Sequence, residues 1–472
     1  MGRQRRKLVM TRDKSFYRNL VRLAIPIALQ NLITFAVGFA DNLMVGSLGD
    51  NAISGVYMGN QPQTILQMFI SGVEGAILVL AAQYWGRDDR ESIKKVVSVG
   101  IRFAVGVGIA ATLLATVFPR QIISLLTNNA GIIDAGAEYL QILGFSYVFF
   151  CISQVLIASM RSVEVAKIGL YTAMFAFAAN TGVNYVLIFG KLGFPAMGVK
   201  GAAIATLITR IAEAAIMIVY VFKTDERLRF TIKDLLKTDA LLQKDFIRYG
   251  LPIIGGNLVW SINMVGQTAI LGHYDSEEVI AATSIALMLH QLVYVWMNGM
   301  ASAVGIITGK TVGAGLYDKM KEYAKTVQII FVCVGLLSGA FVFLVRDGFI
   351  SLYTLSIGVN EGISLGAQEY AKQFINVISV TLIGSCYQVA GLFGLVKSGG
   401  DISFVFKMDI VAVIGVLTLG SLMAFVFGAE PWVVFFCLKI DQLLKCIVAA
   451  IKINSFNWMK NLTRSGERAV EN

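Results

Sequence analysis

Residues 23–46 read LAIPIALQNLITFAVGFADNLMVG, and Asp41 is the single charged side chain in this stretch. Residues 249–272 read YGLPIIGGNLVWSINMVGQTAILG and contain no charged side chain. A helix of about 20 apolar residues spans the hydrocarbon core of a bilayer. Both stretches therefore predict membrane-spanning helices, and each has a proline as its fourth residue.

The whole chain repeats this pattern of long apolar stretches. Its 472 residues are 56% hydrophobic and 15% charged, whereas soluble domains carry about 25% charged residues. We predict an all-α membrane protein with twelve transmembrane helices in two pseudo-symmetric six-helix bundles. The predicted spans are 20–45, 53–82, 96–118, 137–159, 168–189, 199–222, 249–271, 279–309, 323–345, 371–396, 403–427 and 431–453.

Lysine and arginine residues cluster on every second loop between the predicted spans and on both tails. Positive residues collect on cytoplasmic loops, so we predict a multi-pass protein of the plasma or inner membrane with both termini cytoplasmic and no cleaved signal peptide. This topology accounts for the net charge of +10 without a nucleic-acid partner. The predicted parts are a basic tail (1–19), an N-lobe (20–222), a cytoplasmic linker (223–248), a C-lobe (249–454) and a second tail (455–472).

The two lobes are related by an internal repeat. The matched positions are Pro26 with Pro252, Asn31 with Asn257, Gly46 with Gly272, Gly72 with Gly299, Ala76 with Ala303, and Gly86 with Gly313. An even number of helices in each half gives both halves the same orientation, as in transporters built from parallel repeats. The repeat therefore favours a transporter over a receptor or scaffold.

Polar side chains inside the spans are candidates for a transport site, because ionisable groups are costly there. Gln30, Thr34 and Asp41 share one helix face, and Asn180 and Asn184 are one turn apart. We predict that these amides meet Asp41 at a cavity. The alternatives are that Asp41 reaches the outer interface and that the asparagines only join helices.

Other polar residues in the spans divide into candidates and structural groups. Glu74 is a candidate second acid, and its repeat partner is Ala301. His290 is expected to be hydrogen-bonded in the packing, although it is also a candidate cavity residue. We expect Arg210 with Glu213 and Asp441 with Lys445 to form ion pairs within their helices. Arg102 and Asp409 are expected to reach the cytoplasmic interface.

Enzyme signatures are missing from the sequence. It contains no phosphate loop and no Gly-x-Ser-x-Gly elbow, so we expect neither ATP hydrolysis nor acyl transfer. Its five cysteines lie in apolar segments without a C-x-x-C pair, and we expect them to be buried hydrophobes. We therefore predict no enzymatic activity, no cofactor and no resident metal.

Several motifs resemble those of the multidrug and toxic compound extrusion (MATE) family of secondary transporters, and in particular its clostridial-type bacterial members. The motifs are residues 23–26 and 39–46 of the first span, Gln83-Tyr84-Trp85-Gly86, Met160-Arg161-Ser162, residues 180–185, and residues 198–203. The resemblance covers nearly the whole chain. It implies two six-helix lobes around a central cleft, and the export of organic cations or other drugs driven by protons or sodium.

The resemblance also assigns residues. It implies that Asp41 binds the coupling cation, alongside Asn180, Asn184 and Thr206, and a transient sodium ion at Asp41 would fit this role. Members that use the C-lobe carry acids at the positions of Trp260 and Cys386, which are not acidic here. Gln267 stands where the repeat would place a copy of Asp41, so the N-lobe is the predicted coupling lobe.

Our hypothesis from the sequence is an antiporter in which Asp41, assisted by Asn180, Asn184 and Glu74, alternates between cation and substrate. Gln30, Thr34, Gln267 and His290 are predicted to line the cavity. We expect a monomer in the bilayer that carries small cationic amphiphiles, and the residues do not decide between proton and sodium coupling. The alternative is a flippase for lipid-linked precursors, which would need several cationic side chains for a pyrophosphate group.

Overall fold

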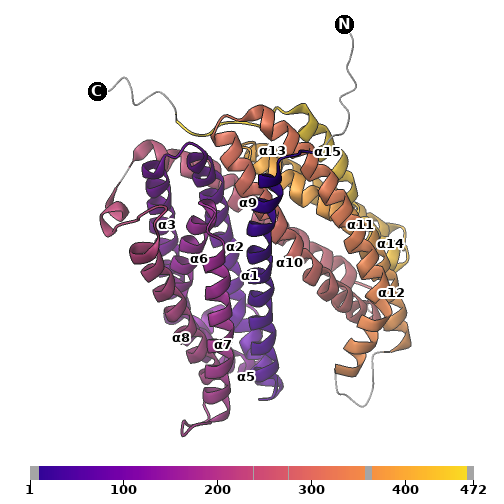
Figure 1. The fold of residues 1–472 in the computed structure, drawn as a ribbon. Coiled ribbons are helices and arrows are strands. Elements are labelled where there is room, and N and C mark those ends of the chain that lie inside the picture. The colour runs from indigo at the N-terminus through magenta and orange to yellow at the C-terminus, as the bar shows by residue number, and fades with distance from the viewer. Residues whose placement is uncertain (1–9, 238, 275, 357–363, 465–472) are drawn as a thin grey trace. The chain divides into compact units, whose positions relative to one another are not determined.

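The computed structural model describes residues 10–237, 239–274, 276–356 and 364–464, apart from the side chains of residues 50, 51 and 352–356. All regular structure in these ranges is helical. Nine of the described helices are long and apolar enough to cross a membrane, and the pair α5–α6, bent by 52°, is a tenth candidate. Together with α9 and α14–α15, they reproduce the twelve predicted spans (Figure 1).

Each predicted span has a counterpart among the helices. In the first half these are α1 (Lys14–Gly46), α2 (Asp50–Gly86), α3 (Arg90–Val117), α5 (Ala130–Gly144) with α6 (Tyr147–Ser162), α7 (Lys167–Phe189), and α8 (Gly198–Val219) with the π-helical η1 (Tyr220–Thr224). In the second half they are α9 (Ala240–Gly272), α10 (Glu277–Gly313), α11 (Tyr317–Ser356), α12 (Leu365–Gln388) with η3 (Val389–Lys397), α13 (Ile402–Ser421) with η4 (Leu422–Val426), and α14 (Pro431–Lys439) with α15 (Asp441–Ser455). Two short helices, α4 (Pro119–Ser124) and η2 (Ile232–Leu236), lie between spans.

The chain divides into two compact units at residues 24/25 and 254/255, inside α1 and α9. The first unit is Ile25–Ile254, and the second is Met1–Ala24 with Gly255–Asn472. The predicted lobes instead divide at the linker. The start of α1 belongs to the second unit because it packs on α11, where the ring centroids of Phe16 and Tyr323 lie 4.4 Å apart. The start of α9 belongs to the first unit because it packs on α2.

Glycines of α2 allow this close approach of α9 within the first unit. A Cβ atom at Gly72 would lie 2.3 Å from Ile254 Cγ1, and one at Gly75 would lie 2.9 Å from Ile253 Cγ2. Small residues of this kind let helix backbones approach closely in membranes. Around this contact, α2 also packs against α3, α5 and α6, and α8 packs against α5, α6 and α7 (Figure 1).

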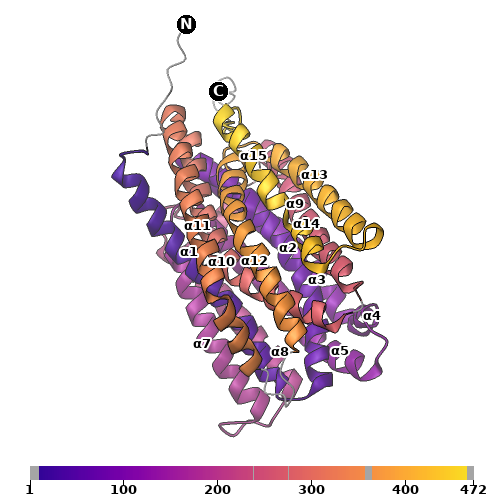
Figure 2. The same cartoon turned by 90° about the vertical axis from the view of Figure 1, so that its right-hand side faces the viewer.

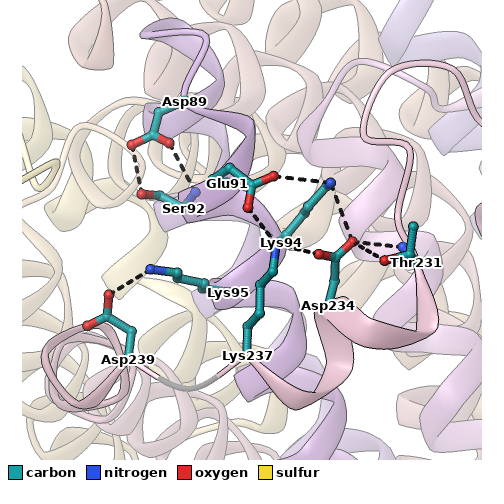
Figure 3. Close-up of polar contacts among 9 residues, drawn as sticks. All are labelled: Asp89, Glu91, Ser92, Lys94, Lys95, Thr231, Asp234, Lys237 and Asp239. Atoms are coloured by element: carbon teal, nitrogen blue, oxygen red, sulfur yellow. Dashed lines mark hydrogen bonds and ion pairs between the residues drawn. The ribbon is translucent and has the colours of Figure 1, made fainter.

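The predicted linker docks on the start of α3 in the first unit. Figure 3 shows the ion pairs: Lys94–Asp234 (3.4 Å), Lys237–Glu91 (2.7 Å), Lys237–Asp234 (2.7 Å) and Lys95–Asp239 (3.2 Å). Burial alone would raise the pKa of Asp234, but hydrogen bonds from Lys237 and Thr231 outweigh it and lower this pKa to about 2. Ion pairs therefore hold the linker, which includes η2, against the start of α3.

In the second unit, α12 packs against α10, α11, α14 and α15 (Figure 2). Its apolar core includes Phe374 of α12 and Phe435 of α14, whose rings stack with centroids 4.5 Å apart. The span formed by α14 and α15 is interrupted at Ile440. This interruption leaves Lys439 and Asp441 on either side of it, inside the unit, where both side chains are buried.

Candidate functional site

The first polar cluster forms around Asp41, about one turn before the end of α1 at Gly46. The amide nitrogen of Asn184 on α7 donates hydrogen bonds to Asp41 Oδ1 at 2.6 Å and to Asn180 Oδ1 at 3.0 Å. Asn180 and Asn184 are 2% and 1% exposed, whereas Asp41 is partly exposed. The predicted contact with Asp41 is present for Asn184, whereas Asn180 is linked to Asp41 through Asn184; their role in cation binding stays a prediction.

The other polar atom of Asn184 has no hydrogen-bond partner in the part of the chain that the structure describes. Its Oδ1 is buried and accepts no hydrogen bond from the described residues. A buried carbonyl oxygen without a donor costs free energy unless a ligand or water satisfies it. Next to a carboxylate, such an oxygen suits a bound cation or an ammonium group.

Arg210 on α8 joins this cluster, which the sequence did not predict. It forms the predicted ion pair with Glu213 at 2.7 Å and lies over the Phe150 ring at 5.0 Å. It also interacts electrostatically with Asp41. The spacing of Arg210 and Glu213 predicted only a self-contained pair, because opposite charges three residues apart on one helix can neutralise each other.

Tyr139 on α5 connects further helices to the cluster. Its hydroxyl donates to Asn60 Oδ1 on α2 at 3.2 Å, and it is also hydrogen-bonded to Thr206 on α8. Thr206 Oγ1 itself donates to the Ala202 carbonyl at 3.1 Å. Tyr139 and Asn60 were missed, although a tyrosine within an apolar span usually needs a hydrogen-bond partner.

Glu74 lies in a different cluster. Its carboxylate interacts electrostatically with Arg161, whose guanidinium donates to Gln30 Oε1 at 2.7 Å. Glu74 is 14 residues further along α2 than Asn60, so at 1.5 Å per residue it lies about 20 Å along the helix from the contact of Asn60 with Tyr139 in the first cluster. The structure therefore places the two acids apart. Thr34 Oγ1 donates to the Gln30 carbonyl at 2.9 Å.

The second unit has a separate polar cluster around Gln267, the repeat counterpart of Asp41. The Lys439 ammonium donates to Gln267 Oε1 at 2.8 Å, and Gln267 Nε2 donates to Asn263 Oδ1 at 3.0 Å. The imidazole of His290 stacks on Tyr294 with centroids 5.5 Å apart. Its Nε2 is buried and has no hydrogen-bond partner among the described residues, so the expected hydrogen-bonded packing role is incomplete at that atom.

Two aspartates share one lysine nearby. Lys445 lies 3.0 Å from Asp409 and 3.4 Å from Asp441. The predicted pair of Asp441 with Lys445 is confirmed. The expectation that Asp409 reaches the cytoplasmic interface is wrong, because this side chain is buried and paired with Lys445.

The described residues contain no group of three or more His, Cys, Asp and Glu side chains that could hold a metal ion. The cysteines are unpaired, and three of them, Cys151, Cys386 and Cys437, are buried as predicted. Cys446 is half-buried and Cys333 is exposed. The polar clusters therefore consist of carboxylate, amide, hydroxyl and cationic groups.

Comparisons with known proteins agree with the helical fold in two halves. The family model MatE matches residues 26–186 and 252–426, which is one segment in each half. A relative from Halalkalibacterium halodurans, named probable multidrug resistance protein NorM, is 26% identical over 94% of this chain and 94% of its own length. A protein of the same name from Thermotoga maritima is 26% identical over 71% of this chain and 72% of its own length.

Solved structures share the fold. A MATE structure in complex with MaL6 superposes with a TM-score of 0.83 at 19% identity, covering 93% of this chain and 97% of that one. A MOP superfamily transporter from Pyrococcus furiosus gives a TM-score of 0.82 at 18% identity, covering 95% of this chain and 99% of that one. The matches do not favour the alternative of a lipid-linked precursor flippase.

Proposed function

This chain belongs to the MATE family of multidrug efflux transporters, and from this premise we propose that it is an antiporter that exchanges cationic amphiphiles for protons or sodium ions at Asp41. We place it in the bacterial plasma membrane and propose that it acts as a monomer without enzymatic activity or a cofactor. The buried, unpaired Asn184 Oδ1 beside the Asp41 carboxylate is the observation that carries this proposal.

The charges of the first cluster support exchange. Asp41 and Glu213 each contribute one negative charge and Arg210 contributes one positive charge, which leaves one net negative charge when all three are ionised. One proton, one sodium ion or one cationic substrate group neutralises this excess. Because burying an uncompensated charge is costly, the three kinds of cation compete for the same place.

The donors and acceptors around Asp41 fit either coupling ion. The Asp41 carboxylate and the Asn184 and Asn180 amide oxygens are ligands of the type that hard cations prefer. Asn184 Nδ2 stabilises the ionised carboxylate, and a proton on Asp41 could instead be donated to an amide oxygen. Coupling then requires only that the bound cation and the substrate favour different conformations of the protein.

Aromatic side chains of the first unit lie beside the cluster and make its surroundings apolar. Phe150 lies under the Arg210 guanidinium, and Tyr139 joins α2, α5 and α8 next to the cluster. Phe150 and Tyr139 are each 4% exposed, so they form an apolar wall behind the cluster. A substrate with an aromatic body and one positive group suits these surroundings and the single excess negative charge. We therefore propose organic cations with aromatic rings as the substrate class.

Efflux of ethidium from proteoliposomes tests the proposal, with a pH gradient and a sodium gradient imposed separately. Asp41→Asn removes the excess negative charge and should abolish efflux driven by either gradient. Glu138→Gln is the matched control, because Glu138 is a partly exposed acid paired with Lys200, and it should leave efflux unchanged. Undiminished efflux by Asp41→Asn would refute the assignment.

A further inference from the structure

The second unit contains an aromatic stack that leads from an exposed side chain to a buried one. Trp260 on α9 is 41% exposed, and its ring stacks on Tyr294 of α10 with centroids 6.3 Å apart and planes 8° apart. Tyr294 stacks in turn on His290, which is 8% exposed. The stack offers flat faces to an aromatic ring and ends at the unpaired Nε2 of His290.

A buried ammonium group lies beside the end of this stack. Lys439 is 3% exposed and interacts electrostatically with His290. Its hydrogen bond to Gln267 is the one that the ammonium makes within the described residues. Gln267 donates onward to Asn263 and to the Leu438 carbonyl, so the chain of hydrogen bonds that starts at Lys439 contains amide and carbonyl groups but no anion.

The carboxylates of this unit do not neutralise Lys439 fully. Asp409 and Asp441 are both within 3.4 Å of Lys445, and Asp409 also interacts with Lys397. Asp441 interacts with Lys439 without a direct contact among the described atoms. Three lysines therefore share two aspartates, which leaves one positive charge uncompensated. A buried cation in this situation is stabilised by an anion that completes the pairing.

We propose that Lys439 and His290 form an anion site in the second unit, which binds the carboxylate of an aromatic or zwitterionic molecule. The ammonium uses one of its three donors on Gln267, so two remain for carboxylate oxygens. His290 adds an Nε2–H donor, and the Tyr294 and Trp260 rings contact the aromatic body of the ligand. The ligand's role as a transport substrate rests on the proposed efflux function, whereas its binding does not.

Three probes with one ring system separate charge recognition from ring recognition. They are 2-naphthoate, its uncharged methyl ester, and naphthylmethyl-trimethylammonium, each titrated by calorimetry into the purified full-length protein. The wild-type protein should bind naphthoate more tightly than the ester. Lys439→Met should weaken naphthoate binding about tenfold or more relative to the ester, since hydrogen bonds to charged groups are individually strong.

Other variants keep the test decisive if Lys439→Met does not fold. Lys439→Arg retains the charge and should retain most of the preference for naphthoate. His290→Phe keeps a ring on Tyr294 but removes Nε2, and it should weaken naphthoate binding a few-fold relative to the ester. Lys200→Met is the control, because Lys200 is an exposed lysine of the first unit, and it should change neither affinity.

The outcomes distinguish this site from the proposed antiport. Equal affinity of the wild-type protein for naphthoate and ester, or an unchanged ratio in both Lys439→Met and His290→Phe, would overturn the anion site. A failure of Asp41→Asn to weaken binding of the trimethylammonium probe would count against the cation site at Asp41. That second result would leave the preference for naphthoate intact as evidence for the site at Lys439.

Discussion

The contact between α7 and α8 positions Asn184 and Thr206, and Gly201 makes this contact possible. A Cβ atom at Gly201 would lie 2.7 Å from the Leu187 carbonyl oxygen, 2.8 Å from its carbon and 3.0 Å from the Ile188 nitrogen. All three atoms belong to backbone, so none can rotate away. Gly201→Ala must therefore push α8 away from α7.

The size of the effect follows from two opposing terms. Overpacking of a well-packed contact costs about 1–3 kcal/mol, while replacing glycine by alanine within a helix gains up to about 1 kcal/mol. Gly182→Ala on α7 gives the helix term alone, because nothing lies within 4 Å of a Cβ atom there. The difference in the free energy of unfolding between the two variants should therefore be about 1–3 kcal/mol, with Gly201→Ala less stable.

Unfolding of the purified variants in mixed micelles, followed by circular dichroism, measures this difference. The displacement of α8 should also lower ethidium efflux in Gly201→Ala but not in Gly182→Ala, because only the former moves Thr206 relative to Asn184. Equal stability and equal efflux of the two alanine variants would refute the reasoning. Reduced efflux with unchanged stability would show that the contact affects transport without limiting the fold.

Three further predictions concern charged and polar contacts. Lys445→Met should destabilise the protein by about 3–5 kcal/mol in micelle unfolding, because Asp409 and Asp441 lose their shared buried partner, and adding Asp409→Asn should restore part of that loss. The pKa of Asp234 is lowered to about 2, so the ionised carboxylate stabilises the folded protein fully above the ordinary pKa of an aspartate, and this stabilisation is lost as the pH falls towards 2. The melting temperatures of the wild type and Asp234→Asn should therefore converge between pH 5 and pH 2.5. A constant difference would contradict the assignment. Asn184→Ala removes a hydrogen bond to the Asp41 carboxylate and should weaken binding of the naphthyl trimethylammonium probe about tenfold, whereas an unchanged affinity would exclude a direct role.

The spans and the repeat could be predicted from the sequence because the bilayer imposes simple requirements on each segment. Every span needs about 20 apolar residues, and the positions of Pro26 and Pro252 in the two halves mark the same point of each first helix. The meeting of Asp41 with Asn184 was also predictable. Few polar groups are available within the spans, and the spacing of Asn180 and Asn184 presents both on one helix face.

The remaining contacts depend on depth and packing, which the sequence does not encode locally. Arg161 lies just outside the predicted span 137–159, but the fold buries it beside Glu74. Lys439 falls within the predicted span 431–453 and was not predicted as a site residue, because its burial beside Gln267 depends on the break at Ile440 and on the packing of α14. The boundaries of the two units lie inside α1 and α9, at residues 24/25 and 254/255, because of the tertiary packing of these helices. The order of the spans along the sequence predicted instead that each helix belongs wholly to one lobe.

The repeat and the charges of the two units together predict how a second cation site could be made. Gln267 stands at the repeat position of Asp41, but Lys439 donates to it at 2.8 Å, so the second unit already holds a cation of its own at this place. Gln267→Asp alone should form an ion pair with Lys439 and leave the number of bound trimethylammonium probes per protein unchanged in equilibrium dialysis. Gln267→Asp combined with Lys439→Met should add about one bound probe, because the new carboxylate then lacks a partner. An added site in the single variant, or none in the double variant, would show that Lys439 does not govern the polarity of the second unit.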